Sequence, residues 1–332
     1  MEFISDYGMF LAKAVTILVV VWLIVALIVS ASQKQQDEDQ IEIKNLNKKF
    51  AHMKLLMQQA LLSKKEVKAL AKQIKKDNKK KDDGRKRVYV LNFVGNIKAS
   101  AVKHMRKEIT ALLSVATSND EVVVCLENAG GMVHEHGLAA SQLQRIKERN
   151  IPLTVAVDKV AASGGYMMAC VADRILAAPF SIIGSIGVIA QIPNFNKLLE
   201  KHGIEYEQIK AGDFKRTLTM FGKNTDEDRA RFTEQMEETH DLFKEFVADN
   251  RSQLDIAKIA TGEHWLGKKA LELELVDELI TSDDYLLKQS EDADVYEIKH
   301  SSPKSFSEKI MGNAQMAFDR VLTAWWEKKL LT

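Results

Sequence analysis

Hydrophobic and polar residues follow two periods over residues 88–300. Short apolar runs predict buried strands, and longer segments with apolar residues three or four positions apart predict amphipathic helices. We expect strands at 88–93, 121–126, 153–157, 174–177 and 188–191, and helices at 100–115, 137–149, 166–171 and 226–251. Strands that alternate with helices in this way predict an α/β domain.

The amino-terminal part has a different pattern. Residues 14–31 are an almost purely apolar run, close to the roughly 20 residues that a helix needs to cross a bilayer. A secretory signal peptide is the alternative, because Val29, Ser30 and Ala31 resemble a cleavage site. The run is longer than a typical signal core and the flank before it is not basic, so we predict a transmembrane helix.

Lysines around this segment bear on its orientation. Lys13 precedes it, whereas Lys34, Lys44, Lys48 and Lys49 follow it, which favours a cytoplasmic carboxyl-terminal side. A large domain can be translocated against such a bias, so charge alone leaves the side of the membrane open.

Between the apolar run and the α/β domain, apolar or small residues recur at heptad-like spacing from 43 to 74. This spacing predicts a helical stalk that either pairs with copies of itself or lies on anionic lipid through its lysines. The lysine-rich residues 75–84 predict a solvated linker. They lack the interleaved aromatic residues of a nucleic-acid site, so we expect no nucleic-acid partner.

Composition fits one large folded domain with an appendage. The 332 residues are 46% apolar and 28% charged, and the net charge of +1 says little about partners. Cys125 and Cys170 lie in apolar stretches, which is typical of buried free thiols. Trp325 and Trp326, near the carboxyl terminus, fit either a lipid interface or docking on protein. We expect a flank at 1–13, the membrane helix at 14–31, the stalk and basic linker at 32–87, the folded domain at 88–300 and an amphipathic tail at 301–332.

Three loops combine glycine with a small polar residue, at 128–131, 163–165 and 184–187. Because ligands of α/β folds bind at the carboxyl ends of strands, we expect these loops to meet at one cleft. Ser163 stands where a strand gives way to a helix, a turn that exposes a hydroxyl beside backbone N–H groups, as acyl transfer requires. The alternative is that Ser163 only caps the helix.

Other polar residues indicate less. His134 and His136 are two positions apart without a third metal ligand nearby, and we interpret them as loop or cleft residues. Lys215, taken alone, fits a surface lysine. The chain has no nucleotide-binding fingerprint, so we expect no dependence on ATP, no metal and no other cofactor.

Four motifs, in this order and spacing, are specific enough to indicate a family. They are Ala161-Ala162-Ser163-Gly164-Gly165-Tyr166, Gly184-Ser185-Ile186-Gly187, Gly212-Asp213-Phe214-Lys215 and Thr261-Gly262-Glu263-His264-Trp265. In these motifs the chain resembles the membrane-bound serine peptidases of the signal peptide peptidase A type, over residues 88–280. The resemblance implies a fold like that of Clp protease and crotonase, a homo-oligomer, and a single-pass protein of the bacterial inner membrane.

The resemblance also implies roles for individual residues. Ser163 matches the nucleophile, Lys215 the general base, and Ser185 the hydroxyl that orients the lysine amine. The backbone N–H groups of Gly131 and Gly164 would form the oxyanion hole. A lysine acts as a base only when its amine is neutral, which requires desolvation or a cationic neighbour. The apolar side chains next to the lysine could supply that desolvation.

The first glycine loop departs from the family pattern. Residues 127–131 are Glu-Asn-Ala-Gly-Gly, whereas the family commonly has Asn-Ser-Pro-Gly-Gly. Ala129 therefore replaces a stiffening proline, and we expect a more mobile oxyanion loop.

The expected activity follows from the resemblance. It is a membrane-anchored serine endopeptidase that hydrolyses hydrophobic peptides, signal-peptide remnants or misfolded exported proteins. The expected partners are peptide or unfolded-protein substrates, membrane lipid and further copies of the chain. The alternative is a catalytically silent membrane scaffold that holds peptides in the same cleft. A crotonase-type acyl-CoA enzyme would share the fold but has no need of the Ser163/Lys215 pair. Charge favours a cytoplasmic catalytic domain and the resemblance a periplasmic one; we expect the periplasmic side.

Overall fold

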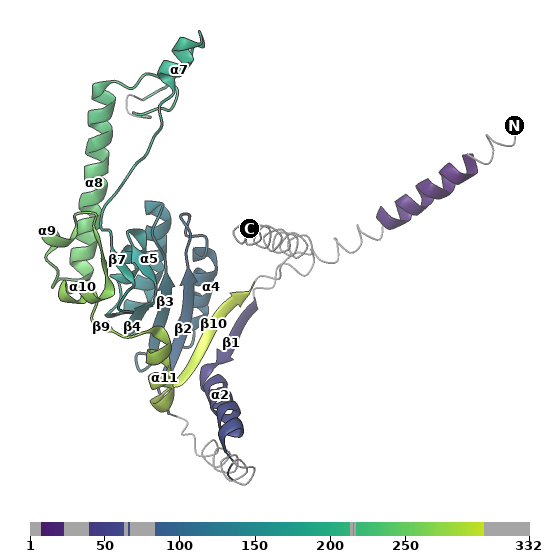
Figure 1. Cartoon of the computed structure of the whole chain (residues 1–332), viewed down its shortest axis with the longest axis vertical. Helices are drawn as coiled ribbons and strands as arrows, with labels where there is room; N and C mark the ends of the chain where they lie inside the picture. The colour runs from purple at the N-terminus through teal and green to yellow at the C-terminus, as the bar shows by residue number, and fades with distance from the viewer. Residues whose placement is uncertain are drawn as a thin grey trace, which may run out of the picture. The chain divides into compact units, whose positions relative to one another are not determined.

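The computed structural model describes residues 8–22, 40–62, 66, 84–212, 215 and 217–301. Residues 43–299 belong to one compact unit, and the other described residues, 8–22, 40–42 and 300–301, belong to a second. The first unit has a mixed α/β fold (Figure 1).

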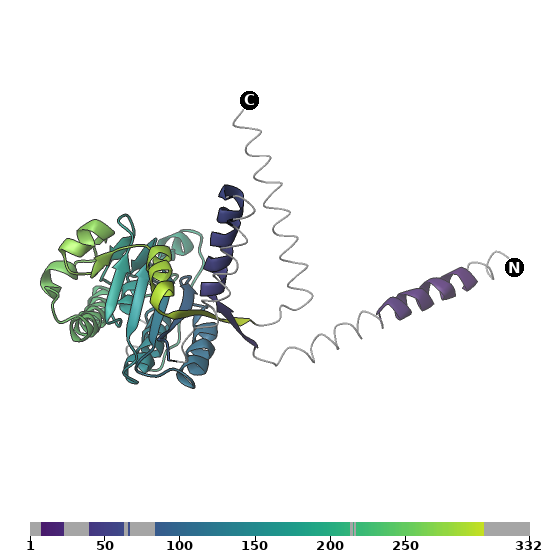
Figure 2. The same cartoon turned by 90° about the horizontal axis from the view of Figure 1, so that it is seen from below.

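The main sheet has seven strands in the order β1–β10–β2–β3–β4–β6–β9 (Figures 1 and 2). Every pair from β10 across to β9 is parallel. A parallel sheet is covered on both faces, which explains why the predicted strands are continuous apolar runs. The strands are β1 (Gln40–Asn45), β2 (Arg87–Val94), β3 (Glu121–Glu127), β4 (Leu153–Val157), β6 (Arg174–Ala177), β9 (Glu278–Leu279) and β10 (Asp294–Ser301).

Alternate residues of each strand point to opposite faces of this sheet. One face packs on α2 (Leu46–Leu61) and α11 (Ser282–Asp292), where Val90, Val123 and Ala156 share a core cluster with Leu46 and Leu286. Three further helices are α4 (Val102–Leu113), α5 (Val133–Lys147) and α6 (Gly164–Ala169). Helix α5 contacts both α4 and α6, while α4 contacts β2 and α6 contacts β3. All six residues of α6 are buried.

A second, three-stranded sheet has the order β5–β7–β8. Its strands are β5 (Val160–Ala162), β7 (Ile182–Gly184) and β8 (His264–Leu266); β5 is parallel to β7, and β8 is antiparallel to it. The prediction of a strand at 188–191 was wrong, because β7 precedes the glycine turn at 184–187 and the described residues that directly follow that turn form no strand. Ile183 is buried against β5 and β8, whereas the Ile189 side chain is 79% exposed.

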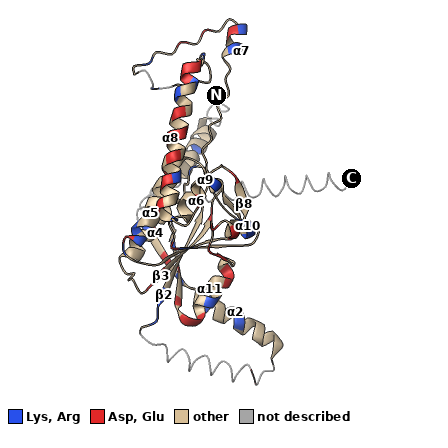
Figure 3. Ribbon diagram, turned by 90° about the vertical axis from the view of Figure 1, so that its left-hand side faces the viewer, with Lys and Arg blue, Asp and Glu red and all other residues tan. Residues whose placement is uncertain are grey.

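The remaining helices follow the second sheet. Helix α8 (Asp226–Asn250) begins with a capping box, in which Thr225 and Asp228 each bond the other's backbone N–H. Phe243 and Val247 of α8 are buried, and Figure 3 shows acidic and basic residues at many positions along its ribbon. Helix α7 (Asn196–Lys201) lies near the amino end of α8, away from the main sheet (Figure 1). Two short helices, α9 (Ile256–Ile259) and α10 (Gly267–Glu272), flank β8.

Several expectations fall partly or wholly outside the described residues. Residues 8–22 are helical, whereas 23–39, which include the second half of the expected membrane span, are not described. Within the described residues no helix is both long and apolar enough to cross a membrane. Of the expected stalk, 43–45 belong to β1 and 46–61 to α2. The linker at 75–83 and the tail from 302 onward lie outside the described part.

Candidate active site

Ser163 lies between β5 and α6 in a backbone conformation that few side chains adopt. Its φ is 52° and its ψ is −119°, a region that favours glycine. The Ser163 N–H donates to the carbonyl of Gly184 at 2.8 Å, which ties this turn to the end of β7. Ser163 is the N-cap residue of α6, but its side chain makes no capping hydrogen bond.

Ser185 occupies the corresponding turn on the neighbouring strand. Ala162 pairs with Gly184 in the parallel register, so the two serines follow adjacent strands side by side. The φ of Ser185 is also 52°, and its N–H donates to the carbonyl of Glu263 at 2.6 Å. Each such conformation costs about 1–3 kcal/mol and concentrates at functional sites.

The loop after β3 supplies two glycines that lie against Ser163. Gly130 and Gly131 have φ of 93° and 155°. A Cβ on Gly130 would lie 2.7 Å from the Cβ of Ser163, and one on Gly131 would lie 2.1 Å from the carbonyl oxygen of Ile97. Only glycine therefore allows this loop to approach the serine.

A pocket of about 20 Å³ joins the three glycine loops. Ser163, Gly131, Gly164, Gly187 and Val188 line it, together with side chains of α5, α6 and α8. The expectation that the three loops meet at one cleft is confirmed. Its volume is that of about one water-sized group, such as a carbonyl oxygen. Within the described residues no turn or loop hydrogen bond uses the N–H of Gly131 or Gly164, and both glycines line the pocket.

His136 is a part of this region that the sequence interpretation placed wrongly. It is not a loop or cleft residue but a member of α5, and its exposed fraction is 0%. Its Nε2 lies 3.1 Å from Asn128 Oδ1, and its Nδ1 lies 2.9 Å from the carbonyl oxygen of Met132. His134, two residues earlier, has a side chain that is 78% exposed.

The structure does not place Lys215 in the Ser163 pocket. Lys215 is exposed, and its backbone N–H donates to the carbonyl of Gly212 at 3.3 Å. The neighbours Phe214 and Arg216 lie outside the described residues. One chain therefore brings Ser163, Ser185, Gly131 and Gly164 together but leaves the expected base apart from the pocket lining.

Two other reactive groups are excluded as nucleophiles at neutral pH. Burial raises the pKa of Cys125 and of Cys170 to about 12, so both are protonated thiols. They are free thiols, as expected. Among the residues with described positions, no group of three potential ligands is arranged to hold a metal ion.

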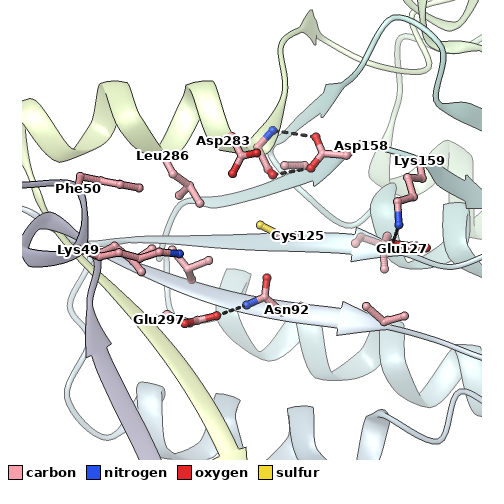
Figure 4. Close-up of a pocket in the computed structure, with 16 residues that line it drawn as sticks. Lys49, Phe50, Asn92, Cys125, Glu127, Asp158, Lys159, Asp283, Leu286 and Glu297 are labelled. Atoms are coloured by element: carbon pink, nitrogen blue, oxygen red, sulfur yellow. Dashed lines mark hydrogen bonds and ion pairs between the residues drawn. The ribbon is translucent and has the colours of Figure 1, made fainter. Parts of the chain in front are cut away.

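A larger cavity of about 380 Å³ lies between α2, α11 and the main sheet (Figure 4). Figure 4 shows Cys125 in it, below Asp158, which accepts hydrogen bonds from the N–H and hydroxyl of Ser282. Across the cavity the Asn92 amide donates to Glu297. These polar groups satisfy one another, and the cavity shares no lining residue with the Ser163 pocket.

Comparison with known proteins adds the family context. The family described as "Peptidase family S49 N-terminal" matches residues 2–143, and "Peptidase family S49" matches 145–296. The chain is 46% identical over 330 residues to "Probable protease SohB" of Haemophilus influenzae, with 95% of this chain and 94% of that protein covered. It is 32% identical over 199 residues to "Putative signal peptide peptidase SppA" of Enterococcus faecium, with 58% of each covered.

Among solved structures, a mutant of the "1510-N membrane-bound stomatin-specific protease" superposes with a TM-score of 0.39 and 17% identity, over 62% of this chain and 85% of that one. The sequence matches confirm the resemblance that the four motifs indicated.

Proposed function

This chain belongs to peptidase family S49, and from that membership we propose that it is a membrane-anchored serine endopeptidase with a Ser163/Lys215 dyad. Lys215 takes the proton of the Ser163 hydroxyl, and the serine oxygen attacks the peptide carbonyl. The Gly131 and Gly164 N–H groups stabilise the oxyanion, the amine leaves with a proton, and water hydrolyses the acyl-enzyme. The proposal includes the Clp protease and crotonase type of fold.

The observation that carries this proposal is the geometry around Ser163. Its hydroxyl is not used as a helix cap, its backbone is strained, and it lines a pocket together with Gly131 and Gly164. Acyl transfer requires a nucleophile at a pocket and backbone donors beside it, and the half-buried Ser163 with the two glycines fits that requirement. The buried thiols, with pKa values near 12, offer no competing nucleophile.

The position of Lys215 supports assembly into a homo-oligomer. Lys215 is exposed and lines no pocket with Ser163, whereas a lysine base needs a desolvated amine. The segment around it also exposes large apolar side chains: Leu198 is 52% exposed, Ile204 54% and Ile209 91%. A second copy that covers this segment would bury these side chains and would bring a Lys215 amine to a Ser163 pocket.

Apolar side chains near the pocket support hydrophobic peptides as substrates. Ile97, whose carbonyl contacts the glycine loop, is 69% exposed, and Met132 and Val133 directly after Gly131 are 41% and 46% exposed. Ile189 is 79% exposed, next to the lining residue Val188. Such a surface suits extended apolar segments, including signal-peptide remnants and misfolded exported proteins.

Membrane anchoring rests on the amino-terminal segment. The helical residues 8–22 expose Phe10 at 69%, Leu18 at 67% and Trp22 at 67%, with an apolar continuation to residue 31 in the sequence. We place the anchor in the bacterial inner membrane with the catalytic domain on the periplasmic side. Digestion of the domain by protease added to spheroplasts supports that side, and protection until lysis contradicts it.

The experiment is hydrolysis of unfolded protein and hydrophobic peptides by the detergent-solubilised full chain. Ser163→Ala and Lys215→Ala should each abolish turnover, while Ser141→Ala and Lys223→Ala, exposed residues outside the pocket, should leave it unchanged. Equal activity of wild type and Ser163→Ala refutes the proposal, and peptide binding without turnover supports the scaffold instead. If copies share a site, mixing the two inactive variants should restore part of the activity.

A further inference from the structure

We propose that His136 is a positioning residue that fixes the oxyanion loop, residues 128–132, against the start of α6. The proposal rests on the proposed function, since an oxyanion loop has a role only in acyl transfer. His136 is wholly buried and is used neither as a nucleophile nor as a base in that mechanism.

His136 is attached to both ends of the loop, to the first residue by its imidazole and to the last by its backbone N–H. Its Nε2 lies 3.1 Å from Oδ1 of Asn128, the first loop residue, and its Nδ1 lies 2.9 Å from the carbonyl oxygen of Met132, the last one. The backbone N–H of His136 donates to the same Met132 carbonyl at 3.1 Å. The two glycines that approach Ser163 lie between these two attachment points.

The same ring also contacts the second oxyanion donor. A Cβ built on Gly164 would lie 2.4 Å from Cγ and 2.6 Å from Cδ2 of His136, so the ring packs directly on the Gly164 backbone. Gly131 and Gly164 both line the pocket, and their N–H groups are the oxyanion donors of the proposed function. The ring therefore lies against one donor and holds the loop that carries the other, which sets their separation.

Asn128 links the His136 ring to the backbone of the loop. Its Oδ1 accepts the Gly130 N–H at 2.6 Å, which fixes the direction of the amide and makes His136 Nε2 the donor to Oδ1. In a neutral ring Nδ1 then has no proton to donate, so the Met132 carbonyl accepts from the His136 backbone N–H. With the amide in this direction, Asn128 Nδ2 is buried near Gly95 with no hydrogen-bond partner among the described atoms. An unsatisfied buried donor costs about 1–3 kcal/mol, so the contacts of Oδ1 fix the amide against a preference to turn.

These contacts bear on the expectation of a mobile loop. Without proline at position 129 we expected a mobile loop. Three contacts hold it instead: the Asn128 side chain, the His136 side chain, and the Met132 N–H, which donates to the carbonyl of Ile97 at 2.9 Å. Because His136 acts through the loop and does not line the pocket, its loss should lower kcat more than it changes KM.

The test compares His136→Leu, His136→Gln and the matched control His134→Phe in the full chain. Leucine fills the space but donates nothing, whereas glutamine reaches Asn128 Oδ1 with its amide nitrogen. We expect kcat to fall about 10- to 100-fold in His136→Leu with KM within about twofold, because a full oxyanion donor is worth about 10²–10³. The kcat of His136→Gln should be within about threefold of the wild-type value, and the kcat of His134→Phe should equal it.

Amide hydrogen exchange over residues 128–132, measured without substrate, separates this proposal from the proposed function. Exchange should accelerate at least about tenfold in His136→Leu and stay close to wild type in His136→Gln. Unchanged exchange in His136→Leu, or an unchanged kcat in a folded sample, overturns the positioning role. If wild-type turnover does not exceed that of Ser163→Ala, the proposed function fails, and the exchange result still decides whether His136 fixes the loop.

Discussion

Replacing Gly164 by alanine is the most direct perturbation of the pocket, because it adds one methyl group where the structure has no space. Gly164 is buried at the first position of α6, with the His136 ring on one side. The new Cβ would lie 2.4 Å from His136 Cγ, about 1 Å closer than ordinary van der Waals contact. Either the ring or the start of α6 must therefore move by about 1 Å.

The size of the effect follows from that displacement. The 3.1 Å contact between His136 Nε2 and Asn128 Oδ1 would lengthen beyond hydrogen-bond range. Overpacking a core costs about 1–3 kcal/mol, and alanine in a helix returns at most about 1 kcal/mol relative to glycine. We expect a net loss of about 1–2 kcal/mol in the free energy of unfolding. A 1 Å misplacement of catalytic groups also lowers kcat by as much as about 100-fold.

The control is Gly137→Ala, next to His136 on α5, where an added Cβ meets nothing within 4 Å. It should raise the free energy of unfolding by about 0.5–1 kcal/mol and leave kcat unchanged. Chemical denaturation and peptide hydrolysis measure both quantities in each variant. If Gly164→Ala keeps the stability and the kcat of the wild type, the reasoning is refuted, because the Gly164 backbone would then have room that the structure does not show.

Two further predictions concern groups that do not line the pocket. Asp277 accepts both terminal N–H groups of Arg251 at 2.8 Å and the Ile175 N–H at 2.6 Å, and Arg251 is 3% exposed. Asp277→Ala should therefore lower the free energy of unfolding by about 3 kcal/mol. This value is the low end of the range for breaking a buried ion pair, because the Asp277 side chain is 32% exposed. A loss under about 1 kcal/mol in urea denaturation contradicts this prediction. Burial raises the pKa of Cys170 from 9.0 to about 12. The stability that the buried neutral thiol contributes is therefore complete below pH 9 and is lost as the pH rises toward 12. Cys170→Ala should make stability fall less steeply over that range, by up to about 1.4 kcal/mol per pH unit, and an identical slope in both proteins would show that the thiol is not buried in this way.

Much of the fold was predictable because buried parallel strands have a strong sequence signal. The runs at 88–93, 121–126, 153–157 and 174–177 coincide closely with β2, β3, β4 and β6. The meeting of the three glycine loops was also predictable, from the rule that strand ends share one edge of a sheet. The second sheet was missed because its strands have three residues each, too few for a period to show.

The role of His136 depends on contacts that a local pattern does not contain. Its partner Asn128 is eight residues away, and the direction of that amide follows from the fold. One signal was available: His136, Ala139, Ala140 and Leu143 recur at helical spacing, and all four are buried. That spacing places the histidine on the inner face of α5 and argues against a loop or metal site.

The strained serines explain why so much buried structure surrounds a pocket for one oxygen atom. Two positive φ angles together cost about 2–6 kcal/mol, so the turns keep them only if no alternative packing is available. Helix α6 is buried along its whole length, and the Tyr166 hydroxyl bonds the Leu275 carbonyl at 2.9 Å. This fixed helix prevents Ser163 from relaxing, and the pairing of β5 with β7 extends the constraint to Ser185. Lys215 is exposed, so within the described part of one chain the proposed nucleophile and oxyanion donors are held by buried structure while the proposed base lies outside their pocket.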